Sequence, residues 1–147
     1  GELIRSFLEL RRVVAAEAVA LACERATAEQ LAFLGELAEQ QQQEEDAAAF
    51  AERDLRFARA LVRSAGNLAM ELLLNSVERI YLSLPEVVTA MHADRPAVRA
   101  SYSQVVGLVQ ARQATLARVA VRMVLEKQDA RTLEMLSNRA DAGERPC

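Results

Sequence analysis

The feature that most limits the fold of this chain is a helical spacing of apolar residues, which recurs along nearly its whole length. Phe50, Phe57 and Leu61, for example, fall on one face of a helix that ends at Gly66 and Asn67. The chain has only 5 glycines and 3 prolines, so it offers little material for strands and turns. We therefore predict an all-α fold.

Capping residues and prolines divide this pattern into seven expected helices. Thr27 and Gln30 form a capping box, in which the hydroxyl accepts from the third helical amide and the glutamine reaches back. Asp46 and Asn67 are expected to cap the third and fourth helices, and prolines open the fifth and sixth. The expected helices cover residues 2–25, 28 to about 38, 47–65, 68 to about 84, 85–91, 96–112 and 114–138. We expect one domain over residues 1–139 and a disordered tail over 140–147.

Two segments carry specific expectations about burial. Residues 40–45 are glutamine and glutamate only, which is too polar for a core, and we expect a frayed helix end followed by a loop. Residues 68–84 are apolar on nearly all sides, so this helix should be either central in the domain or part of a subunit interface.

Charge and cysteine content exclude several classes of function. The net charge is −3, whereas binding to a nucleic-acid backbone needs a basic face. The 2 cysteines, Cys23 and Cys147, form neither a disulfide framework nor a metal-ligand spacing, which fits a reducing cytoplasm. No apolar run reaches the length of about 18 residues that a membrane span requires, and no signal peptide is evident. We expect no membrane partner.

Two polar positions lie beside apolar helix faces. Asp54, with Ala58 one turn later, is either a solvated boundary residue or a polar anchor that faces an interior cavity. Arg11 and Arg12 interrupt the apolar stripe of the first helix. They are either solvated, with their stems covering apolar surface, or placed so that one guanidinium reaches inward.

Several segments resemble a known family. These are Leu-Glu-Leu-Arg at 8–11, the run 18–27 that ends Ala-Cys-Glu-Arg-Ala-Thr, residues 50–61, and Ala-Gly-Asn at 65–67. They are similar to the C-terminal effector domain of FadR-type GntR transcriptional regulators. The resemblance implies an antiparallel bundle of six to seven helices around a central cavity that binds a small effector, and a homodimer. It also implies that operator DNA is bound only through an N-terminal winged helix-turn-helix domain of the parent protein, which these residues do not contain.

Many members of this family hold a divalent metal through one aspartate and three histidines. The resemblance places Asp54 at the aspartate position, but Ala58, Tyr102 and Val124 at the histidine positions. The only histidine, His92, lies in an expected loop and matches none of them. A lone carboxylate supplies too few ligands for a transition metal, so we expect neither a metal nor another cofactor.

Fatty-acid-responsive members of the family also lack the metal and bind long-chain acyl-CoA. The resemblance therefore implies an acyl-CoA, a fatty acid or another organic acid as effector. Arg11, Asp54 and Tyr102 would form the polar fringe of its cavity, and Ala58, Val106 and Val124 the apolar wall. The alternative is a dimerisation scaffold with a collapsed cavity. An enzyme would need Asp54, Arg11 and Tyr102 to act together, but no nucleophile-base pair or phosphate loop accompanies them.

Overall fold

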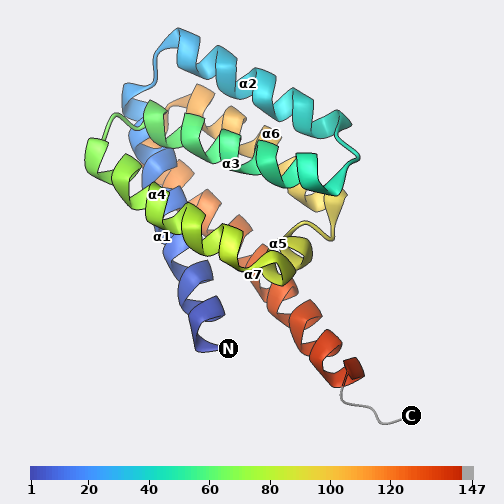
Figure 1. Ribbon diagram of the computed structural model, residues 1–147. Helices are drawn as coiled ribbons and strands as arrows, with labels where there is room; N and C mark the ends of the chain where they lie inside the picture. The colour runs from blue at the N-terminus through green and yellow to red at the C-terminus, as the bar shows by residue number, and fades with distance from the viewer. Residues whose placement is uncertain (144–147) are drawn as a thin grey trace.

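The computed structural model describes residues 1–143, which form seven helices and no strand (Figure 1). The all-α prediction is therefore confirmed. The helices are α1 (Glu2–Arg25), α2 (Ala28–Gln43), α3 (Ala47–Ser64), α4 (Leu68–Ser83), α5 (Pro85–Met91), α6 (Arg95–Ala111) and α7 (Ala114–Gly143).

The expected caps set the starts of three helices. Thr27 and Gln30 form both hydrogen bonds of the capping box, at 3.1 and 3.0 Å. Asp46 accepts from the Ala49 amide and Asn67 from the Met70 amide, so each satisfies a backbone donor that the helix itself leaves free. Gly66 adopts φ +64°, and this left-handed conformation ends α3 and turns the chain into α4.

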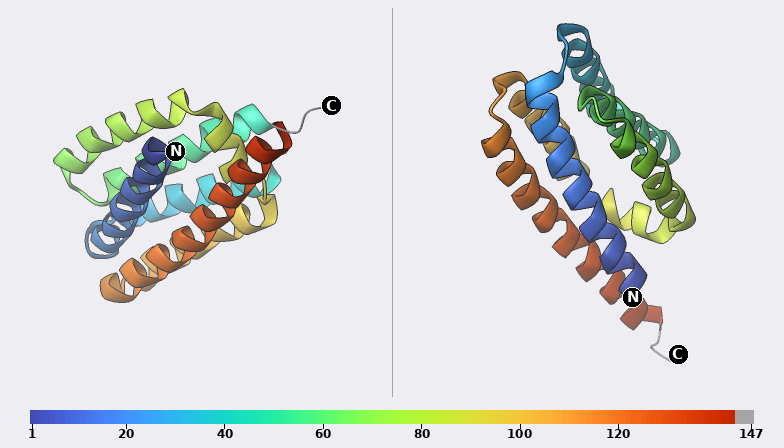
Figure 2. Two further views of the ribbon diagram at one scale, coloured as in Figure 1. Left: turned by 90° about the horizontal axis from the view of Figure 1, so that it is seen from below. Right: turned by 90° about the vertical axis from the view of Figure 1, so that its left-hand side faces the viewer.

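The central element of the bundle is α1, which contacts α3, α4, α6 and α7. The C-terminal half of α1 is rich in small side chains that are almost fully buried, among them Ala16, Ala18, Val19 and Ala22. Small side chains let neighbouring helices approach closely, and this explains how one helix touches four others. Helix α7 runs antiparallel to α1, and α2 packs on α3 and α6 (Figure 2).

Helix α4 lies at the edge of the bundle, so the expectation of a central position is wrong. It contacts α3, α1 and α5, while Leu68, Leu72 and Leu82 are 72%, 63% and 66% exposed. The small residues of α1 fill the centre instead. The other expectation for α4, a subunit interface, stays a prediction.

Two segments continue as helix beyond their expected ends. Helix α2 extends to Gln43, and Gln41 within it is fully buried, which corrects the expectation of a frayed, solvated end. Helix α7 continues past Asn138 to Gly143, so the first residues of the expected tail are helical. Residues 144–147 lie outside the described residues.

Candidate functional site

The carboxylate of Asp54 on α3 is the centre of a polar cluster inside the bundle. Its Oδ1 accepts a hydrogen bond from the Tyr102 hydroxyl on α6, and its Oδ2 accepts from the Tyr81 hydroxyl on α4 at 3.2 Å. His92, directly after α5, places Nε2 3.3 Å from the same Oδ2. One carboxylate therefore binds side chains from three other parts of the chain.

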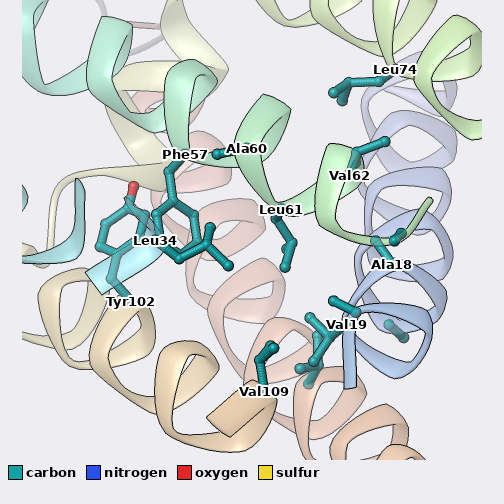
Figure 3. Packing of buried hydrophobic residues seen from close by; sticks show 14 of the residues in the cluster. Ala18, Val19, Leu34, Phe57, Ala60, Leu61, Val62, Leu74, Tyr102 and Val109 are labelled. Carbon is teal, nitrogen blue, oxygen red and sulfur yellow. The ribbon is translucent and has the colours of Figure 1, made fainter. Parts of the chain in front are cut away.

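Tyr102 also connects this cluster to α2. The Gln41 side-chain amide donates to the Tyr102 hydroxyl at 3.2 Å and to the Phe50 carbonyl at 3.1 Å. Because Tyr102 accepts from Gln41 and donates to Asp54, its hydroxyl is fixed in one direction. The Tyr102 ring packs edge-on against Phe57, with 4.9 Å between ring centroids (Figure 3).

The protonation states within the cluster follow from its geometry. Burial raises the pKa of Asp54, but the hydrogen bond and charge of His92, the Tyr102 hydrogen bond and the charge of Arg11 outweigh it, so the pKa lies below its ordinary value. Burial, and then the charge of Asp54, raise the pKa values of Tyr81 and Tyr102. At neutral pH the tyrosines are therefore donors, and Asp54 is an ionised acceptor.

Arg11 reaches the same region from α1. Its Nη2 donates to Asp129 Oδ1 on α7 at 2.7 Å, and Arg12 Nη1 donates to the other oxygen of Asp129 at 2.8 Å. Asp129 is 1% exposed, whereas the two arginines keep about a quarter of their surface. Both arginines thus turn toward one buried carboxylate. The Nε of Arg11 is buried and has no hydrogen-bond partner among residues 1–143.

A cavity of about 160 Å³ lies next to the cluster, mainly between α1, α3, α4, α6 and α7. Five of the six residues that the sequence assigned to an effector site line it, namely Arg11, Asp54, Ala58, Tyr102 and Val124. The sixth, Val106, is buried but does not contribute to the wall, and Val105 does so instead. Successive positions on a helix point about 100° apart, so a shift of one residue decides which valine faces the cavity.

Four members of the site were not assigned from the sequence. Tyr81 was assigned only to an apolar helix face, Gln41 to a frayed end, and His92 to a loop without a role. Asp129 was not singled out at all. None of these residues lies near Asp54 or Arg11 in the sequence, so no local spacing could have indicated the contacts.

The residues present do not fit the metal site that many FadR-type domains carry. Among residues 1–143, no group of three or more histidine, cysteine, aspartate or glutamate side chains is placed so that it could hold a metal ion. Asp54 and His92 are two such ligands at most, and both already bind neighbours. The hydroxyl of Tyr102 would have to lose its proton to bind a metal, which its raised pKa opposes.

Comparison with known families places most of the chain in one of them. The sequence profile of the FCD domain family matches residues 6–127. Comparison with curated proteins gives no significant match. Within residues 1–143, no helix combines the length and apolar character that crossing a membrane requires.

Proposed function

Since the chain belongs to the FCD domain family, the regulatory effector-binding domains of GntR-type transcription regulators, we propose that it senses a small organic molecule in its cavity. Domains of this family act in regulation and are not enzymes. The proposed site is metal-free, and its occupancy would control DNA binding by an N-terminal winged-helix domain of the parent protein.

The observation that carries this proposal is the cavity itself. Most of its wall is apolar, and a smaller number of polar side chains, among them Asp54 and Arg11, also line it, which is the usual composition of a small-molecule site. A cavity of about 150 Å³ holds one benzene molecule, so this one has room for roughly six to eight non-hydrogen atoms. Among acyl-CoA, fatty acids and other organic acids, this volume favours the smallest, or only a short acyl group of a larger ligand.

Filling the cavity tests the proposal. In Ala58→Phe the new ring would enter the existing space, so we expect the domain to stay folded by circular dichroism and to lose the ligand-induced rise in melting temperature. The matched control is Ala60→Phe on the same helix, because Ala60 is 8% exposed but does not line the cavity. There the ring should overpack the core at a cost of about 1–3 kcal/mol, while ligand binding by the folded protein remains.

The probes are short-chain acyl-CoAs, fatty acids and their esters. If none of them raises the melting temperature of the wild type, and Ala58→Phe unfolds the domain, the cavity is closed. The dimerisation scaffold would then be the better account.

We further infer that the domain forms a homodimer through the outer face of α4. Leu68, Leu72 and Leu82 share this face, and their large exposure in a single chain is the reason to expect a partner. Glu71 and Arg79 lie four positions to either side of Asn75. In an antiparallel pair of α4 helices centred on Asn75, Glu71 would face the second copy's Arg79, and Leu68 would face its Leu82.

A further inference from the structure

The carboxylate of Asp54 keeps room for one more hydrogen bond. An ionised carboxylate accepts at about four positions and donates at none. Tyr102 donates to Oδ1, whereas the Tyr81 hydroxyl and His92 Nε2 both lie against Oδ2. Within residues 1–143, at most three of the positions are therefore taken, and Oδ1 retains one of its two.

The exposed part of Asp54 faces the cavity. Asp54 lines the cavity wall, and its side chain is 25% exposed. The three side chains that hold it, Tyr81, His92 and Tyr102, are all buried. A molecule that fills the cavity therefore separates the remaining position of Oδ1 from water, and must either donate to it or leave it without a partner.

Leaving that position without a donor is unfavourable. Asp54 is ionised at neutral pH, because its pKa lies below the ordinary value. Removing water from a polar atom without replacing the hydrogen bond costs free energy, and the cost is greater for a charged atom than for a neutral one. An effector that lacks a donor would bear this cost, whereas an O–H or N–H group at Oδ1 would avoid it.

The other charged groups of the wall leave this position open. His92 lies at Oδ2 of Asp54, so it does not occupy Oδ1 in either protonation state. The two oxygens of Glu78 each accept from Arg59. Arg11 uses one N–H on Asp129, and its other N–H groups can bind an acceptor of the effector, whether that is a carboxylate or a neutral oxygen.

We propose that Asp54 accepts a hydrogen bond directly from the effector, so that the cavity selects molecules with an O–H or N–H donor. The favoured class has roughly six to eight non-hydrogen atoms, most of them apolar, and one such donor. The donor lies at Oδ1 of Asp54, and the apolar part lies against the aliphatic side chains of the wall, such as Ala58 and Val124. This inference rests on the proposed function, because it names the chemistry of the same site.

The test uses two pairs of ligands. The members of each pair are equal in charge and in the number of non-hydrogen atoms but differ in one donor. The neutral pair is phenol and toluene, and the anionic pair is 3-hydroxybutanoate and 3-methylbutanoate. Calorimetry at pH 7 on the wild-type domain should give a Kd about tenfold lower, or lower still, for the hydroxyl member of each pair that binds. Toluene leaves water more readily than phenol does, so tighter binding of phenol requires a polar partner in the cavity.

Two variants then identify the partner. Asp54→Asn keeps the size of the side chain but replaces a charged acceptor by a neutral one, so the preference for the hydroxyl member should fall by about tenfold. Glu17→Gln makes the same change on α1 outside the cavity, where Glu17 pairs with Arg118, and the preference should be unchanged. The preference is a ratio of two dissociation constants, so a general loss of stability does not alter it.

The outcomes separate this inference from the proposed function. A pair that binds the wild type without the preference, or a preference that Asp54→Asn leaves intact, would overturn the inference and leave the proposed function standing. The same holds if fatty acids or esters bind and none of the four ligands does. If no ligand of any kind raises the melting temperature of the wild type, both fail. The comparison of the pairs on the wild type needs no variant, so it remains decisive if Asp54→Asn does not fold.

Discussion

Asp129 is the residue whose loss should lower the stability of the domain most. It is buried, and it binds arginines of α1 from its position on α7. Removing one partner of a buried pair leaves unpaired charge, which costs about 3–5 kcal/mol. Because Arg11 and Arg12 keep about a quarter of their exposure, solvent reduces this cost, and we expect Asp129→Ala to lower the free energy of unfolding by about 2–3 kcal/mol.

Urea denaturation followed by circular dichroism measures this loss. The control is Glu17→Ala, because the pair of Glu17 with Arg118 also joins α1 to α7 but is 39% exposed on both sides. That variant should change stability by about 1 kcal/mol or less. Equal effects of the two substitutions would contradict the special role of the buried carboxylate.

At the scale of single residues, the sequence could predict some members of the site and not others. Asp54 and Arg11 stand out because each is a charged residue on an apolar helix face. Asp129 and His92 are surrounded by polar or irregular sequence, so nothing local marks them as buried. Their burial is decided by which helices cross near them, and the spacing along one helix does not contain that information.

At the scale of elements, α4 offers a direct prediction about assembly. Leu72→Asp places a charge at the centre of the exposed leucine face and should convert the proposed dimer to a monomer in sedimentation velocity. Leu116→Asp on α7 is the matched control, because Leu116 is 57% exposed and lies on another face. A dimer that survives Leu72→Asp and dissociates with Leu116→Asp would place the interface on α7.

Helix α2 shows why composition alone misjudged one element. Its glutamine run is polar, yet Gln41 is buried because the two N–H donors of its amide find acceptors in the Phe50 carbonyl and the Tyr102 hydroxyl, while its Oε1 has no hydrogen-bond partner among residues 1–143. A buried polar side chain is tolerated when its donors are satisfied, so polarity does not exclude burial. These acceptors on α3 and α6 allow the polar end of α2 to remain helical as far as Gln43.

For the whole molecule, charge predicts how the domain behaves toward DNA. The net charge of the chain is −3. Most of the non-specific affinity of a protein for DNA comes from basic side chains that bind the phosphate backbone. We expect the domain alone to give no shift of operator DNA in a gel at physiological salt. The full-length parent protein, as control, should bind an inverted repeat as a dimer. Sequence-specific binding by residues 1–147 alone would contradict the assigned division of roles.

The fold could be predicted at the level of class and helix order but not of packing. Caps and spacing identified seven helices, with starts at Thr27, Asp46 and Asn67 as the structure has them. The central place of α1 was not foreseen, because its buried alanines look less hydrophobic than the leucines of α4. Close approach between helices depends on small size as much as on hydrophobicity.

The pairing of α1 with α7 has a consequence for how the domain is made. Arg11 and Asp129 lie 118 positions apart, and Val124 and Gln128 of α7 form part of the cavity wall. A growing chain is synthesised at about 5–20 residues per second, so for many seconds it has α1 but lacks the helix that completes the wall. The proposed effector site is therefore incomplete until α7 has been made, and an effector bound there would stabilise only the finished chain.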